Sequence, residues 1–230
     1  MLKNFSNYWE TKHRDAEYFH EELSPLVKEE IINLNLSASS CVLDHGCGQG
    51  RVSFFIAKFT NHIYLNDISS TAIKKTLATF KSEFSNINPV AFTGMLYEAN
   101  FKKQFDLIIS HRVLHCMTKE ERIKTYKFYY DSLKKGGKIL LSVKSINCKK
   151  YDQICTSKNY HLDNTEKGSF FSSNPFRFLQ FFDIDLIANE LHIQNLLITK
   201  HFEFFEKSGN KKSITSNLGN LYLFCLVAKK

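Results

Sequence analysis

CVLDHGCGQGR, residues 41–51, is the stretch that decides the fold of this chain. Its first three residues are apolar and predict a short strand buried on both faces, which ends at Asp44. Three glycines follow at alternate positions, and residues 53–59, SFFIAKF, have apolar side chains at helical spacing. A strand, a glycine turn and a helix in this order predict a doubly wound α/β sheet with a ligand crevice at the carboxyl end of the first strand.

The glycine spacing distinguishes between kinds of ligand. A dinucleotide-binding turn reads G-x-G-x-x-G, and Arg51 occupies the third glycine position in this register. A P-loop, G-x-x-x-x-G-K-[ST], is not found here. An acidic residue followed by G-x-G-x-G resembles motif I of the class I S-adenosylmethionine-dependent methyltransferases. The alternative is a turn that only joins strand to helix.

A second apolar run, HIYLND at residues 62–67, ends in Asp67, which lies 23 positions after Asp44. A carboxylate at this place can accept hydrogen bonds from both ribose hydroxyls of an adenosine. The continuation resembles the D-I-S motif of the same family, and Ser69 or Ser70 can cap the helix that follows. Two acids that end neighbouring strands therefore favour an adenosyl cofactor.

The adenine subsite departs from the family pattern. Many members have Gly-Asp after the third strand, whereas this chain has Gly94-Met95. The resemblance therefore leaves the adenine ring to be flanked by apolar side chains, which are Ile68, Met95 and Leu96.

Residues 104–117, QFDLIISHRVLHCM, resemble the fourth-strand motif of the family. The following helix is expected to begin at a capping box of Thr118 and Glu121, and a Gly-Gly pair at 136–137 is expected to end it. His111 and His115 follow the strand, where this fold places the transferable methyl, so either could accept a proton from a substrate. The alternative is that they pack or line the cofactor.

Two further segments are predicted to cap the site. Residues 1–35 are expected to form a helical cap in which Trp9 and Arg14 contact the cofactor and Tyr8 contacts the substrate, although Trp9 could instead pack the helix onto the sheet. Residues 146–182 interrupt the strand–helix rhythm and are rich in aromatic side chains. They are expected to cover the substrate or, alternatively, to add core packing. The substrate residues predicted there are Tyr151, Tyr160 and Phe176.

Composition limits the alternatives. The chain has 230 residues, 43% of them hydrophobic and 14% aromatic, which suits one globular domain spanning residues 1–230. It has no apolar run of roughly 20 residues, so no membrane contact is expected. Its start has no signal-peptide core, and its six cysteines have no framework spacing. A cytoplasmic location with reduced thiols is therefore expected. The net charge of +8 is spread along the chain, so nucleic acid is not expected as a partner. Cys148, Cys155 and His161 lack a compact pair, and no metal site is expected.

The resemblance implies a three-layer, Rossmann-like, seven-stranded sheet, mostly parallel with an antiparallel last strand and with helices on both faces. It implies a methyltransferase that uses S-adenosylmethionine, yields S-adenosylhomocysteine and acts on a small molecule, closest to the tellurite-resistance and thiopurine branches. Alternatives are intramolecular cyclisation or cleavage of the cofactor, RNA or protein methylation, and a non-enzymatic binding protein; the oligomeric state stays open. In this interpretation Arg51 pairs with the cofactor carboxylate or faces solvent. The residues expected to bind the cofactor are Trp9, Arg14, Asp44, Gly46, Cys47, Gly48, Arg51, Asp67, Ile68, Met95, Leu96 and His111.

Overall fold

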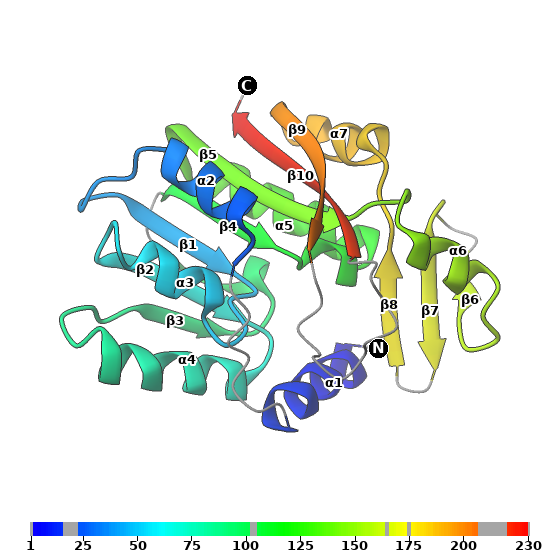
Figure 1. Cartoon of the computed structure of the whole chain (residues 1–230), viewed down its shortest axis with the longest axis horizontal. Coiled ribbons are helices and arrows are strands. Elements are labelled where there is room, and N and C mark those ends of the chain that lie inside the picture. The colour runs from blue at the N-terminus through cyan, green and yellow to red at the C-terminus, as the bar shows by residue number, and fades with distance from the viewer. Residues whose placement is uncertain are drawn as a thin grey trace.

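The computed structural model describes residues 2–15, 23–101, 105–163, 166–173, 176–206 and 220–229. Within these ranges the strands form a seven-stranded sheet in the order β3-β2-β1-β4-β5-β10-β9 (Figure 1). Its strands are β1 (Cys41–His45), β2 (His62–Asp67), β3 (Val90–Thr93), β4 (Phe105–His111), β5 (Leu133–Lys144), β9 (Leu196–Glu206) and β10 (Asn220–Lys229). β10 runs antiparallel to β5 and β9, and the other neighbouring pairs are parallel. The predicted fold class is therefore confirmed.

Helices cover both faces of this sheet. They are α2 (Pro25–Asn33), α3 (Arg51–Ile56), α4 (Ser70–Glu83), α5 (Lys119–Ser132) and α7 (Ile184–Ile193). Alternate residues of the buried strands belong to two separate clusters: Val42 packs with side chains of α2, α3 and α4, and Leu43 packs with side chains of α5 and α7. A strand that is buried on both faces needs apolar residues at successive positions, which explains the CVL run. None of the helices in the described ranges has the length and apolar composition of a membrane span.

Local signals set the helix starts. The Ser69 side chain accepts a hydrogen bond from the Ala72 backbone N–H at 3.1 Å and caps α4. Thr118 and Glu121 form the predicted capping box of α5. Both predictions are confirmed.

The prediction that the Gly-Gly pair ends α5 is wrong. α5 ends at Ser132, and β5 begins at the next residue, so both glycines lie within the strand. Gly136 has φ +80°, and a Cβ on Gly137 would lie 2.8 Å from the Phe105 carbonyl oxygen. The glycines allow β5 to pass close to β4 where the register between the two strands shifts.

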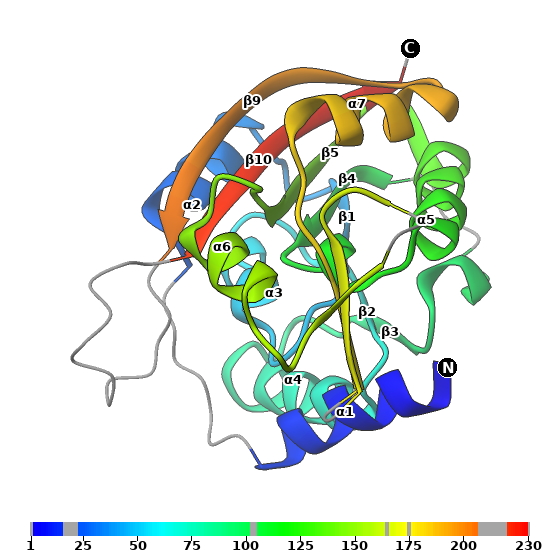
Figure 2. The ribbon, with the colours of Figure 1, turned by 90° about the vertical axis from the view of Figure 1, so that its right-hand side faces the viewer.

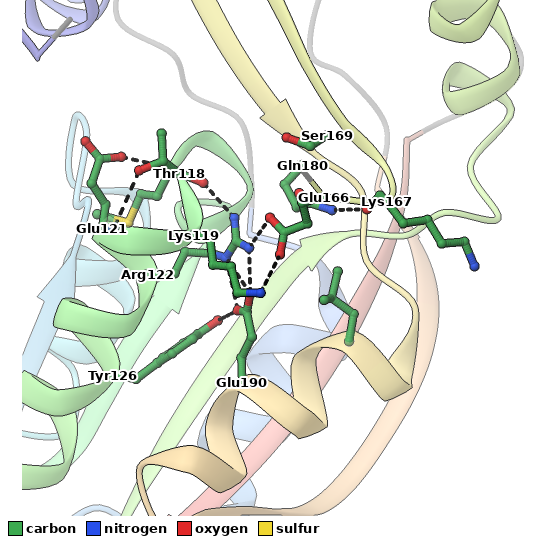
Figure 3. A network of polar contacts seen from close by, with 12 residues as sticks. Thr118, Lys119, Glu121, Arg122, Tyr126, Glu166, Lys167, Ser169, Gln180 and Glu190 are labelled. Atoms are coloured by element: carbon green, nitrogen blue, oxygen red, sulfur yellow. Dashed lines mark hydrogen bonds and ion pairs between the residues drawn. The ribbon is translucent and has the colours of Figure 1, made fainter. Parts of the chain in front are cut away.

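The insertion after β5, residues 146–182, contains a helix and a second, smaller sheet. It consists of α6 (Lys149–Cys155) and a three-stranded antiparallel sheet of β6 (His161–Leu162), β7 (Ser169–Ser173) and β8 (Phe176–Gln180), at the right in Figure 1. A buried ionic network attaches it to two helices that cover the large sheet (Figure 3): the Arg122 guanidinium on α5 donates to Glu190 on α7 and to Glu166 between β6 and β7.

The N-terminal helix α1 (Leu2–Asp15) lies across the ends of the parallel strands and contacts both α4 and β8 (Figure 2). Glu10 accepts hydrogen bonds from the Thr71 backbone N–H at 3.2 Å and the Ser70 hydroxyl at 3.1 Å, at the start of α4. Lys75 of α4 donates to the His13 carbonyl oxygen at 2.5 Å. These contacts hold α1 over the edge of the sheet where the parallel strands end. Residues 16–22, within the predicted N-terminal cap, lie outside the described residues.

Candidate active site

A cavity of about 430 Å³ lies at the carboxyl ends of the parallel strands. Its wall comes from α1, the ends of β1, β2, β4 and β5, the segments that follow them, and single residues of α6, β8 and β10. The volume falls within the range of about 300–1,000 Å³ that is typical of small-molecule sites. It also lies where open α/β sheets place their ligands.

The glycine turn forms one wall, and β2 fixes its shape. The Gly46 and Cys47 backbone N–H groups donate to the Asn66 carbonyl oxygen at 2.7 and 2.9 Å. Gly46 has φ +67°, and a Cβ there would lie 2.3 Å from Cγ2 of Val113. Gly48 has φ +54°, and its N–H donates to the Asp67 carboxylate at 2.8 Å. The turn is therefore pinned to the end of β2 and packed against the segment after β4, which only glycine permits without strain.

Asp44 is a buried carboxylate that accepts a hydrogen bond from the Ser53 hydroxyl. Burial raises the pKa of Asp44 to about 7, the Ser53 hydrogen bond opposes this, and the charge of Asp67 adds to it. Burial disfavours the ionised form of an acid, whereas a nearby cation favours it. A positively charged ligand in the cavity would therefore stabilise Asp44 as a carboxylate.

Asp67 lies at the end of the neighbouring strand and is also buried. Its two oxygens accept hydrogen bonds from the backbone N–H groups of Gly48 at 2.8 Å and Ser69 at 2.9 Å. Burial raises the pKa of Asp67, and the facing His13 of α1 opposes this. Each carboxylate oxygen has a further lone pair, so Asp67 can still accept hydrogen bonds from a ligand.

Apolar residues line the cavity beside Asp67. Ile68, Met95 and Leu96 belong to its wall, and the last two are buried. The Asn66 side-chain amide donates to the carbonyl oxygens of Phe92 at 3.1 Å and Gly94 at 3.0 Å. This amide fixes the chain after β3, so the apolar surface has a defined position.

Two histidines follow β4. A hydrogen bond of 2.8 Å joins His111 Nδ1 and the Ser142 hydroxyl. His115 is 4% exposed, and its Nδ1 has no hydrogen-bond partner among the described residues. Burial lowers the pKa of His115 well below its usual value, and Lys144 and Arg112 add to the effect. His115 is therefore neutral at pH 7.

The structure brings most of the predicted site residues into this one cavity. Those that line it are Trp9, Asp44, Gly46, Cys47, Gly48, Arg51, Asp67, Ile68, Met95, Leu96, His111 and His115.

Four of the predicted residues do not line the cavity, as far as the described residues show. Arg14 is exposed and pairs with the adjacent Asp15 at 3.0 Å, while the Tyr8 ring packs edge-on against Trp9. Tyr151 and Tyr160 pack against the apolar cluster inside the insertion. These two tyrosines thus add to core packing within the insertion. The side chain of Phe176 lies outside the described part of the structure.

Sequence reasoning missed several residues of the cavity wall. These are chiefly basic and aromatic: Lys12, His13, Arg112, Lys144, Lys150, Arg177 and Tyr222. One signal was present in the sequence, because Lys144 directly follows the apolar strand residues ILLSV and is itself buried. A lysine in such a place is rarely buried unless a partner or function accounts for it.

Comparison with known proteins agrees with the fold. Residues 42–137 match the family described as a methyltransferase domain. A curated relative, the probable cobalt-precorrin-6B C(15)-methyltransferase (decarboxylating) of Methanococcus maripaludis, is 36% identical over 101 residues, covering 40% of this chain and 55% of the relative. The chain thus spans about half the length of this curated relative.

Solved structures resemble the whole chain. A SAM-dependent methyltransferase from Methanosarcina mazei has a TM-score of 0.72 at 21% identity, covering 91% of this chain and 99% of the other. The 1,6-didemethyltoxoflavin-N1-methyltransferase of Burkholderia thailandensis, solved with its substrate and S-adenosylhomocysteine, has a TM-score of 0.68 at 15% identity, covering 98% and 87%. Residues 42–137 therefore match a methyltransferase domain, and the chain has the Rossmann-like fold of the solved methyltransferases that it resembles.

Proposed function

We propose that this protein is an S-adenosylmethionine-dependent methyltransferase that acts on a small-molecule acceptor. The observation that carries the proposal is the pair of buried carboxylates, Asp44 and Asp67, which end neighbouring strands beside the glycine turn and face one cavity. The methyltransferase domain match and the solved structure with bound S-adenosylhomocysteine support S-adenosylmethionine as the cofactor.

The chemistry of the cavity wall fits this cofactor. Asp44 and the turn at Gly46 would hold the positively charged methionyl end. Burial disfavours the ionised form of Asp44, and a nearby cation would stabilise that form. Asp67 would accept the ribose hydroxyls, and the apolar residues after β2 and β3 would flank the adenine. A Cβ on Gly48 would lie 3.5 Å from Cε1 of His13, and both residues line the cavity. Arg51 lies close enough to Asp44 to lower its pKa and would pair with the cofactor carboxylate.

When bound, S-adenosylmethionine supplies a methyl group on a positively charged sulfur, open to in-line attack by a lone pair of the acceptor. The protein then has to align the acceptor and exclude water. α1 is placed to exclude water because it lies over the cavity and is tied to α4. His111, oriented by Ser142, would take the proton of an acceptor that has one to lose. His115 would line the acceptor space.

A small acceptor is favoured by the size of the cavity, about 430 Å³, and by the elements that cover it. We propose that residues 1–230 form one domain, with residues 1–35 and 146–182 as caps. The Tyr8-Trp9 element and the C-terminal strand resemble the tellurite-resistance and thiopurine branches, and we propose that this chain resembles them in function. The cytoplasmic location stays a prediction.

Calorimetric titration with S-adenosylhomocysteine tests the proposal. Asp67→Ala should weaken binding by about 1–3 kcal/mol, because charged hydrogen bonds are lost. Asp131→Asn is the matched control, since Asp131 is an exposed residue of α5 paired only to Lys127 among the described residues. Absence of binding by the wild-type protein would refute the proposal. Methylthioadenosine formed from S-adenosylmethionine without an acceptor would instead indicate cleavage or cyclisation.

A further inference from the structure

The cavity has two halves of opposite charge. Asp67 ends β2 and Asp44 ends the adjacent β1, so both carboxylates lie toward one end of the row of strands. At the other end the wall is formed by residues of β4, β5 and β10 and by the insertion. No carboxylate from the described residues lines this second half, which we call the basic half.

Positive side chains from separate segments meet in the basic half. They are Lys12 of α1, Arg112 after β4, Lys144 at the end of β5, Lys150 of α6 and Arg177 of β8. Each element reaches the cavity independently, so their shared location is a property of the fold and not of one basic run in the sequence.

Two of these cations contact the aromatic ring of Tyr222 on β10. The Lys144 ammonium lies 5.1 Å from the centre of the Tyr222 ring, and the Arg112 guanidinium carbon lies 5.3 Å from it. Arg112 has φ +66°, a backbone conformation that is uncommon outside glycine. Such strain is often found at functional sites.

Burial and mutual repulsion disfavour the charged forms of Lys144 and Lys150. Lys144 is 4% exposed, and burial lowers its pKa to about 8, with Lys150 contributing to the decrease. Burial likewise lowers the pKa of Lys150, and Arg177 and Lys12 add to this. Like charges that destabilise one another in a buried space are stabilised by a ligand of opposite charge.

The cofactor alone does not account for this charge. It has one carboxylate, and Arg51 on the acidic half is placed to pair with it. We propose that the methyl acceptor is a small molecule with at least two negative charges, from one phosphate or two carboxylates, held by Lys144, Arg112 and Arg177 beside Tyr222. The inference rests on the function proposed above. A nucleic acid strand fits less well, because α1 and β8 border a cavity of only about 430 Å³.

The test uses the emission of Trp9, the only tryptophan of the chain and part of the cavity wall. The protein is saturated with S-adenosylhomocysteine and then titrated with four aromatic probes of matched size: phenyl phosphate, isophthalate, benzoate and benzamide. At least one of the two doubly charged probes should bind tenfold or more tighter than neutral benzamide. Whichever of the two binds more tightly identifies phosphate or dicarboxylate as the source of the charge.

Variants then locate the binding. Lys144→Met should weaken the doubly charged probe fivefold or more and change the affinity for S-adenosylhomocysteine less than twofold. Lys138→Met, an exposed lysine on the same strand, is the matched control and should change neither. Arg177→Gln, on the insertion, gives a second variant should Lys144→Met fail to fold.

Four results would overturn the inference. The first is that benzamide and the doubly charged probes bind with equal affinity, and the second is that Lys138→Met weakens the doubly charged probe as much as Lys144→Met does. The third is that both Lys144→Met and Arg177→Gln lose affinity for S-adenosylhomocysteine. The fourth is that an RNA oligonucleotide outcompetes every small probe. If the wild-type protein binds the charged probes but not S-adenosylhomocysteine, the proposed function fails, and the acceptor role fails with it.

Discussion

Glu190→Gln should destabilise the protein far more than a surface substitution of the same kind. Glu190 is 2% exposed and accepts hydrogen bonds from Arg122 Nε at 3.0 Å and from the Tyr126 hydroxyl at 3.1 Å. The same guanidinium donates to Glu166 at 2.7 Å. Arg122 is fully buried, and its guanidinium keeps its charge when Glu190 becomes neutral, because arginine stays protonated in proteins at any ordinary pH.

The size of the effect follows from this geometry. Removing one partner of a buried ion pair costs about 3–5 kcal/mol. Glu166 still accepts a hydrogen bond from the guanidinium, and the glutamine keeps one acceptor oxygen. We therefore expect a loss of unfolding free energy at the lower end of this range, about 3 kcal/mol. For a chain of this size, that corresponds to a decrease of about 6–12 °C in the melting temperature.

Urea denaturation followed by circular dichroism measures the free energy of unfolding. Glu120→Gln is the control, because Glu120 is exposed on α5 and pairs with Lys124 at 2.7 Å, four residues away. Such an exposed pair contributes little to stability, because water and salt screen it. If the free energy of unfolding of Glu190→Gln lay within about 1 kcal/mol of that of Glu120→Gln, the reasoning about buried charge would be refuted.

Three further predictions concern the candidate site. Since the pKa of Asp44 is about 7, affinity for S-adenosylhomocysteine should rise from pH 6 to pH 8 as Asp44 ionises, and Asp44→Asn should abolish the rise in calorimetric titrations; a flat wild-type profile would contradict this. Gly46→Ala should lower both stability and cofactor affinity, because its Cβ would lie 2.3 Å from the Val113 side chain, and a variant with normal thermal stability would count against it. Glu10→Gln should loosen α1 by weakening the hydrogen bonds at the start of α4, which should shift the emission of Trp9 to longer wavelength; unchanged emission would argue that other contacts hold the helix.

The sequence predicted the parts of the site that depend on local pattern. Asp44 and Asp67 could be placed because each ends an apolar run, and the carboxyl ends of adjacent parallel strands share an edge. The caps at Ser69 and Thr118 could be predicted because a capping side chain bonds to backbone only three residues away.

The basic half could not be predicted in the same way. Lys144 and Arg177 come together only because β8 of the insertion packs against the segment after β4. Aromatic content likewise does not predict where the side chains of the insertion lie, since Tyr151 packs in a local core and does not line the cavity. Three-dimensional packing of distant segments decides both cases, and neither leaves a periodic pattern in the chain.

The strand order explains why the two halves differ in charge. β4 lies between β1, which ends in the acidic half, and β5, which ends in the basic half. His111 and Arg112, at and just after the end of β4, therefore occupy the boundary between the two. A positively charged cofactor beside Asp44 and a negatively charged acceptor beside Lys144 would each be attracted to its own half and would meet at that boundary. The transferred group would then lie next to His111, because no other parallel strand ends between β1 and β5 in this sheet.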